Sequence, residues 1–191
     1  MGCNVSSASQ AREITNRDTD IFTDRQRRIV RKTWRPLAND MTGNGTKVFL
    51  RIFEMEPKVK QLFPCRDKEG EELLKDMNFK GHASRFMQSV GAAVDNLDSL
   101  ETSLAPLLLK LGRSHTNFSG FKPDYFDIFT RAMLDVWEQE LKDRFTSEVK
   151  ESWLTVFEFM MGKMKEGYMQ AYTEEMNAKN LQKSNGTVVD E

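Results

Sequence analysis

Apolar residues recur every three or four positions along most of this chain, and almost nowhere do they alternate with polar residues. A period near 3.6 residues is typical of an amphipathic helix that buries one face, whereas strict alternation would predict a strand. The sequence therefore predicts an all-α fold. Before about residue 20 and after about residue 172 the chain is polar and loses this period, so we expect a flexible leader over 1–22, one helical domain over 23–172 and a flexible polar tail over 173–191.

Start and stop signals divide the domain into helices. Thr23-Asp24-Arg25-Gln26 has the spacing of a capping box, in which the Thr and Gln side chains accept from free backbone N–H groups at a helix start. Pro57, directly after Glu56, ends one helix and opens a short one. The expected helices cover residues 24–38, the stretch between Gly45 and Glu56, a turn after Pro57, a long segment around residue 80, residues 99–115, a segment that begins at Pro123, and a last one from about Thr146; a charged loop over 66–72 precedes the long helix.

The composition is that of a soluble globular domain and excludes several functional classes. The chain has 191 residues, 39% of them apolar, with 28 Lys and Arg against 29 Asp and Glu. A formal charge of −1 offers no positive excess to phosphates, so we expect no nucleic-acid partner. Two cysteines are too few for a disulfide scaffold. No run approaches the roughly 20 apolar residues of a spanning helix, and the start lacks a secretory apolar segment, which predicts a chain that stays in the cytosol.

Both histidines of the chain fall on the apolar face of an expected helix. His82 shares its face with Phe79 and Phe86, and His115 follows Leu111 by one turn. An unpaired imidazole on a buried face costs free energy, so each ring needs a partner. Two readings are open. Either each ring is hydrogen-bonded to a backbone carbonyl within the core, or both face a slot between two helices and grip a planar metal cofactor from its two sides, for which haem is the obvious candidate.

Several further marks occur in order along the same segment: Trp34 in the first helix, Glu56-Pro57, Leu62-Phe63, His82 and Leu111-x-x-x-His115. The intervals from Phe63 to His82 and from His82 to His115 match the usual layout of a haem pocket. With these marks in this order, the chain resembles the globin family over about residues 23–172. The resemblance implies a globin fold, which is a helical sandwich around haem b, iron protoporphyrin IX.

The resemblance also implies roles for individual residues. His115 becomes the proximal iron ligand, and its other ring nitrogen donates to a carbonyl or hydroxyl such as that of Leu111 or Ser114. His82 becomes the distal residue, and Phe86 stands where many globins have Val, which narrows the space above the iron. A tight distal pocket favours a six-coordinate resting state through His82 and His115, as in globins like neuroglobin. The other cofactor-binding residues implied are Phe49, Phe63, Arg85, Phe86, Leu111 and Phe126, for which core packing of the rings and a solvated charge at Arg85 are the alternatives.

The first six residues, Met1-Gly2-Cys3-Asn4-Val5-Ser6, fit the pattern for myristoylation of Gly2. A single acyl chain gives only marginal membrane residence, and a palmitoyl chain on the adjacent Cys3 would supply the second. A chance Met-Gly start is the alternative. A dually acylated leader before a histidine-coordinated domain resembles globin X, a membrane-attached globin lineage. This resemblance implies a protein that is lipid-anchored to the cytoplasmic face of the cell membrane.

Two functions of different classes use the same residues. The first, which we favour, is binding of oxygen, nitric oxide or carbon monoxide, with electron transfer, redox protection or signalling at the membrane. The second is an enzyme that reduces nitrite to nitric oxide or oxidises nitric oxide, which requires electrons from a reductase that the sequence does not identify. A third reading, a helical signalling module without haem, is disfavoured because Phe63 and His115 occur together. Cys65, next to Phe63-Pro64, is either an inert buried thiol or a redox-active one.

Overall fold

The structure is a computed structural model that describes residues 21–185. Every regular element in that range is helical, which confirms the all-α prediction. None of the helices within it is long and apolar enough to cross a membrane. In chain order they are α2 (Asp24–Ala38), α3 (Met41–Met55), α4 (Pro57–Lys60), α5 (Gly70–Lys75), α6 (Met77–Asp95), α7 (Leu100–Ser103), α8 (Ala105–Ser114), η1 (His115–Asn117), α9 (Tyr125–Leu141), η2 (Lys142–Arg144) and α10 (Ser147–Asn185).

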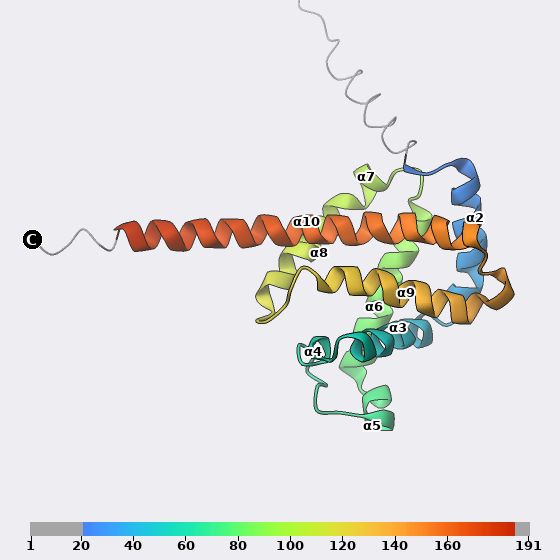
Figure 1. Cartoon of the computed structure of the whole chain (residues 1–191), viewed down its shortest axis with the longest axis horizontal. Helices are drawn as coiled ribbons and strands as arrows, with labels where there is room; N and C mark the ends of the chain where they lie inside the picture. Colours follow the sequence, from blue (N-terminus) through green and yellow to red (C-terminus); the bar gives the residue numbers. More distant parts are fainter. Residues whose placement is uncertain (1–20, 186–191) are drawn as a thin grey trace, which may run out of the picture.

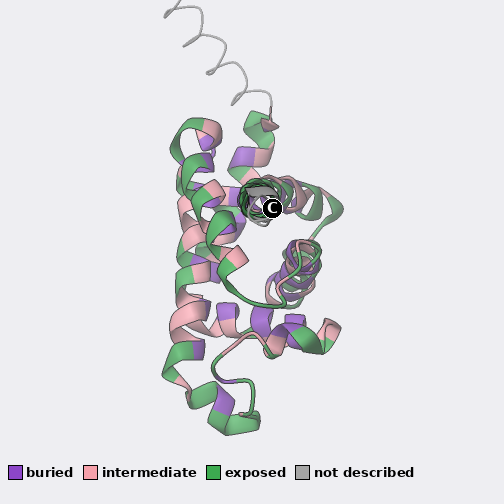
Figure 2. Ribbon diagram, turned by 90° about the vertical axis from the view of Figure 1, so that its left-hand side faces the viewer, coloured by how far each residue is buried: buried purple, intermediate pink, exposed green. Residues whose placement is uncertain are grey.

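The helices pack across one another around one continuous core. α9 and α10 run side by side, and α6 crosses behind them (Figure 1). α10 also packs against α8 and α2, while α3 packs against α6 and α9. Figure 2 looks along α10 from its carboxyl end and shows the buried residues on the faces that the helices turn toward one another. The apolar stripe of each long helix is therefore the face that it buries.

Large aromatic rings join α2, α9 and α10. Trp153 of α10 stacks on Phe157 with ring centroids 5.3 Å apart, and Trp137 of α9 meets both rings edge-on. Trp34 of α2 packs against Trp153. The Trp153 Nε1–H donates to the Thr33 hydroxyl over 2.9 Å, so the polar atom of this fully buried ring is satisfied.

Several predicted boundaries are confirmed. α2 has the predicted range and its capping box, in which Thr23 accepts from the Gln26 backbone and the Gln26 side chain accepts from Thr23. α3 ends at Met55 and α4 begins at Pro57. α10 begins directly after Thr146, whose hydroxyl accepts from the Val149 N–H.

The predicted start of α3 was wrong. We expected Gly43-Asn44-Gly45 to precede this helix, but α3 begins at Met41 and runs through both glycines. The side chain of Asp40 caps it by accepting from the Gly43 N–H over 2.8 Å. Gly45 lies where α3 meets α6, and a Cβ there would overlap the backbone carbonyl of Ala83. A glycine that permits a close helix crossing thus resembles, in sequence, a glycine in a turn.

Three other boundaries also differ from the prediction. The charged loop expected over 66–72 gives way to α5 from Gly70. The single helix expected over 99–115 is interrupted at Leu104, after which Pro106 lies in the first turn of α8. α9 begins at Tyr125 rather than at Pro123.

The segment expected to be a flexible polar tail continues α10 as far as Asn185. Eight of the 13 residues from 173 to 185 are good helix formers, namely two Glu, two Lys and one each of Ala, Met, Leu and Gln, and neither glycine nor proline occurs before Gly186. This part of α10 projects beyond the core (Figure 1), and its side chains over 173–182 are exposed, which accounts for their polarity. Arg113 of α8 holds this extension through two hydrogen bonds to the Glu174 carboxylate, of 2.6 and 2.8 Å.

α8 and α10 approach until their backbones touch. Gly112 of α8 lies against the carbonyl of Met164, and Gly167 of α10 lies against the carbonyl of Leu109. A Cβ at either glycine would overlap the facing carbonyl oxygen. Because each helix presents a glycine to the other's backbone, neither can accept a larger residue at the crossing without moving apart.

We expect Gly112→Ala and Gly167→Ala each to lower the free energy of unfolding by about 1–3 kcal/mol, since the added methyl overpacks a rigid backbone contact. Gly162→Ala is the matched control, because it lies on the same helix as Gly167 with no atom near its would-be Cβ. That change should leave stability equal or raise it by about 0.5–1 kcal/mol. Urea denaturation followed by circular dichroism measures all three, and equal effects at residues 162 and 167 would contradict the backbone contact.

Candidate functional site

The helix that carries His82 starts from a well-satisfied cap. Asp76, the N-cap residue of α6, accepts from the Phe79 N–H over 2.8 Å and pairs with Lys68 over 2.7 Å. The Lys68 ammonium and these backbone N–H groups lower the pKa of the Asp76 carboxyl below its usual value of 3.8. The cap and the burial of Phe79 fix the first turn of α6, and His82 lies one turn further on.

His82 is surrounded by phenylalanine rings. The ring centroids of Phe49 and Phe63 lie 4.8 and 5.0 Å from that of the imidazole, and both meet it edge-on. Among the described residues, none forms a hydrogen bond with the His82 ring. Burial, together with the positive charge of Arg85 and the nearby His115, lowers the pKa of His82 from 6.5 to about 4. The ring is therefore neutral at pH 7 and has an unprotonated nitrogen.

His115 follows the last turn of α8 and is held by that turn. Its Nδ1 lies 2.7 Å from the backbone carbonyl of Leu111, which also accepts from the Ser114 hydroxyl over 2.6 Å. A carbonyl only accepts, so Nδ1 carries the proton and Nε2 retains its lone pair. Burial lowers the pKa of His115 as well. The sequence-based expectation that Leu111 or Ser114 would supply the partner is confirmed for the Leu111 carbonyl.

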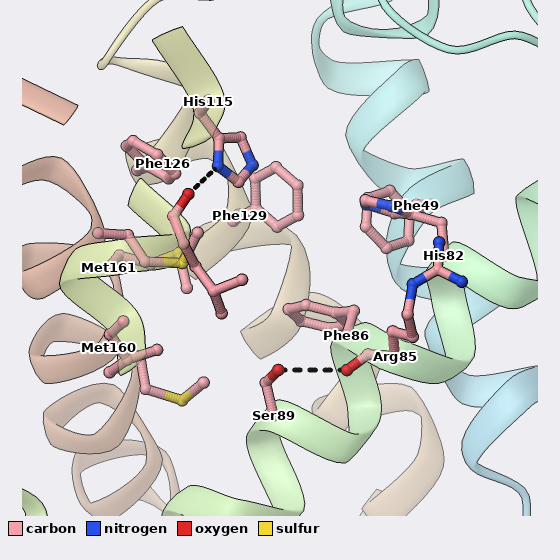
Figure 3. Close-up of a pocket in the computed structure, with 13 residues that line it drawn as sticks. Phe49, His82, Arg85, Phe86, Ser89, His115, Phe126, Phe129, Met160 and Met161 are labelled. Atoms are coloured by element: carbon pink, nitrogen blue, oxygen red, sulfur yellow. Dashed lines mark hydrogen bonds between the residues drawn. The ribbon is translucent and has the colours of Figure 1, made fainter. Parts of the chain in front are cut away.

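Two adjoining cavities lie between these helices. The larger cavity, of about 180 Å³, is lined by residues of α3, α6, α8, α9 and α10 and by His115. The smaller, of about 110 Å³, is lined mainly by two segments, 59–64 and 115–121. His82, His115 and Phe129 line both cavities. Figure 3 shows His115 on one side of the larger cavity and His82 with Phe49 on the opposite side. The two imidazoles thus lie at the junction of a largely aromatic slot.

The structure brings the residues that sequence singled out to this slot. The larger cavity is lined by Phe49, His82, Arg85, Phe86, Leu111, His115 and Phe126, and the smaller one by Phe63. Phe86 packs against Phe49 and Phe129, with ring centroids 5.5 and 5.9 Å apart, and so fills space beside His82. Gly2 and Cys3, the predicted acylation sites, lie outside the described residues.

Sequence reasoning missed part of the cavity wall. Phe129, Met160 and Met164 fall on the apolar stripes of α9 and α10, and their spacing alone indicates core packing. Met161, Leu108 and Ser89 were not singled out for the site, although they line the same cavity. Helical periodicity identifies a face that turns inward, but a side chain that lines a cavity and one that packs against another side chain have the same period.

The chain as a whole can be compared with known proteins. The Globin family model matches residues 46–164, which include all of α6, α8 and α9 and both histidines. The chain belongs to the globin family. Its likeness to Neuroglobin-1 of Oncorhynchus mykiss is 28% identity over 149 residues, which is 77% of this chain and 92% of that globin. Cytoglobin-2 of Danio rerio is 31% identical over 134 residues, 69% of this globin and 74% of that one.

A solved structure has the same fold. The crystal structure of a hexacoordinated heme protein from an anhydrobiotic tardigrade at pH 4 superposes with a TM-score of 0.72 at 23% identity, over 78% of this chain and 96% of that chain. The predicted globin fold is confirmed. The narrower resemblance to globin X stays a prediction, because the similar proteins named above are neuroglobins and cytoglobins in sequence.

The slot fits the haem that the family implies. Two neutral imidazoles from different helices border one narrow space, and one of them has its second nitrogen occupied by a carbonyl, which is the arrangement of an axial iron ligand. Aromatic and aliphatic side chains line the rest of the slot and suit the faces of a porphyrin. The exposed Arg85 guanidinium at its edge suits a carboxylate at the rim of such a ring.

Cys65 is buried and free of disulfide bonds. Burial, and after it the charge of Asp76, raises the pKa of its thiol above the ordinary value. A raised pKa keeps the thiol protonated, and the thiolate is the form that reacts with oxidants. The structure therefore favours the interpretation of Cys65 as an inert buried thiol.

The cap of α6 gives a testable dependence of stability on pH. The lowered pKa of Asp76 means that its carboxylate stabilises the fold above about pH 4, and that this contribution is lost as pH falls through the folded-state pKa. Asp76→Asn retains a capping oxygen but not the charge, so its stability should fall less than that of the wild type between pH 6 and pH 3. Urea denaturation at each pH tests this, with the exposed Asp67→Asn as the control. Parallel pH profiles for the wild type and Asp76→Asn would contradict it.

Proposed function

We propose that this globin binds haem between His82 and His115 in a six-coordinate resting state, and that it binds diatomic gases such as oxygen, nitric oxide or carbon monoxide. The observation that carries the proposal is the hydrogen bond from His115 Nδ1 to the Leu111 carbonyl, which leaves Nε2 free at the slot that His82 borders. Haem bound there supplies an iron that accepts axial ligands and changes between ferrous and ferric states.

The protein residues give the two histidines different tasks. His115 is fixed by its hydrogen bond and by ring contacts with Phe121 and Phe126, at 4.9 and 5.4 Å, so it is suited to a permanent ligand. Within the described residues His82 is held by ring contacts, which resist movement less than a directed hydrogen bond does. Its ring can therefore bind metal at rest and move aside for a gas molecule. Phe86 and Phe49, which crowd His82, restrict the room for that movement.

The proposal extends to the location of the protein. A myristoyl chain on Gly2 and a palmitoyl chain on Cys3 would attach the domain to the cytoplasmic face of the cell membrane. The support is the sequence motif alone, since both residues lie outside the described range. At the membrane, a haem globin of this kind would serve redox protection, electron transfer or signalling, with electrons from a separate reductase.

An absorption spectrum of the purified protein, ferric and then reduced under argon, tests haem binding and coordination together. The wild type should show sharp, split visible bands typical of low-spin iron with two imidazole ligands. His115→Ala should fail to retain haem, and His82→Ala should retain it with a single broad visible band in the reduced form. Lys110→Ala, an exposed change on α8, is the control and should match the wild type. A low-spin spectrum that persists in His82→Ala would refute the distal assignment.

Membrane attachment is tested by cell fractionation. Gly2→Ala removes the acyl acceptor and should move most of the protein from the membrane to the soluble fraction. Asn4→Ala changes a position that the motif leaves open and should stay with the membrane. If Gly2→Ala is recovered with the membrane as fully as the wild type, the acyl anchor is wrong.

A further inference from the structure

The solvent side of α2 carries an uninterrupted row of positive charge. Arg28, Lys32 and Arg35 are all exposed and are spaced four and three positions apart, so they project from one face of the helix. Among the described residues, no acidic side chain forms an ion pair with any of the three. We call these three residues the basic face of α2.

The acidic residues beside the basic face are already committed to other partners. Asp24 pairs with Arg27 over 3.0 Å, and Asp98 pairs with Arg31 over 2.6 Å. Glu148 of α10 pairs with Arg25. These pairs border α2 and neutralise its flanking arginines, but they leave the charge of the three central side chains uncompensated.

The packing of α2 fixes the direction in which this charge points. Val30, Thr33 and Leu37 are buried against the core, where Thr33 accepts the hydrogen bond from Trp153 of α10. A helix that buries one side so completely cannot roll, so its opposite side faces outward. The cavity lined by the two histidines lies on the core side of α2, away from the basic face.

The chain that precedes α2 indicates what this face meets. Gly2 and Cys3, the proposed acyl sites, stand at the start of the leader, and Arg28 follows in the first helix after it. A leader of about 20 residues can span up to about 70 Å when extended, so acyl chains alone would tether the domain without orienting it. The inner leaflet of a membrane is anionic and attracts Lys and Arg within a Debye length of its surface. The basic face of α2, which follows the proposed anchor closely in sequence, is positively charged and would be attracted to that anionic surface.

We propose that the basic face of α2 docks on anionic phospholipid at the membrane surface. This proposal rests on the proposed membrane attachment for its cellular setting. Arg28, Lys32 and Arg35 contact the lipid headgroups, and their long stems let the cations reach the surface while α2 stays packed on the core. Docking through α2 places the histidine-lined cavity on the side of the domain that faces the cytoplasm.

Sedimentation with lipid vesicles tests the docking face. The vesicles are made of phosphatidylcholine alone or of phosphatidylcholine mixed with phosphatidylserine, and the protein is the full acylated chain. Arg28→Glu, Lys32→Glu and Arg35→Glu are combined in one variant. Its matched control combines Lys110→Glu, Arg131→Glu and Lys179→Glu, which change the net charge equally at exposed positions on other helices. Circular dichroism and haem content verify that each variant folds, and three Gln substitutions at the basic face replace the Glu set if it does not.

We expect wild-type binding to phosphatidylserine vesicles to exceed binding to neutral vesicles by at least about tenfold at low salt, and to weaken as salt is raised. The basic-face variant should lose this preference, and the control variant should keep most of it. Equal losses in the two variants would overturn the proposal, since they would show an effect of net charge alone. Displacement of the wild type from vesicles by polyglutamate, with no effect of vesicle charge, would assign the face to an acidic protein instead and would also overturn it.

Gly2→Ala separates this proposal from the acyl anchor. If the anchor fails, the wild type and Gly2→Ala bind neutral vesicles equally, and the preference of both for anionic vesicles still depends on the basic face. If the basic face fails, the acylated wild type binds neutral and anionic vesicles equally, and Gly2→Ala binds neither. The two failures therefore give different patterns on the same two kinds of vesicle.

Discussion

The contact between the backbones of α8 and α10 is the constraint on which the site depends. Gly112 and Gly167 let the two helices touch, so the distance between α8 and α10 at their crossing is set by backbone atoms rather than by flexible side chains. His115 follows the last residue of α8 and is bonded to a carbonyl of that helix. The position of His115 is therefore determined by where α8 crosses α10. Beyond the crossing, Arg113 of α8 and Glu174 of α10 join the same two helices through two hydrogen bonds at the surface.

Burying two imidazoles in an apolar slot lowers the stability of the fold. Burial lowers the pKa of both rings, so each remains neutral, and the structure gives His82 no hydrogen bond within the described residues. A leucine or methionine in its place would avoid the cost of desolvating a polar ring. Neutral nitrogens with free lone pairs are, however, what iron in a porphyrin binds. Binding of a ligand to the folded state alone stabilises that state, so a bound cofactor would offset the cost of burying the two rings.

The sequence predicted the helical class, the bounds of α2 and the eight side chains placed around the slot, because these depend on local period, capping and motif spacing. It failed where distant segments decide the local structure. Gly45 looked like a turn residue because its partner, Ala83, lies far along the chain on another helix, and the polar tail looked flexible because polarity alone does not exclude a helix. The methionines of α10 looked like core for a similar reason. Whether Met160 packs on a neighbour or lines a cavity depends on what α6 and α8 leave open, which no periodicity encodes.

α10 connects the proposed docking face on α2 to the proposed haem site, because it packs against both α2 and α8. Near the start of α10, Trp153 contacts Trp34 and Thr33 of α2. Further along the same helix, the backbone of Met164 contacts Gly112 of α8. About three turns of α-helix separate these contacts, which is about 16 Å along a rigid rod. A domain that rests on lipid through α2 would therefore hold His115 at a fixed position relative to the surface. Because the histidine-lined cavity lies on the core side of α2, docking would leave it on the cytoplasmic side, where a gas molecule and a separate reductase would reach it without any movement within the fold.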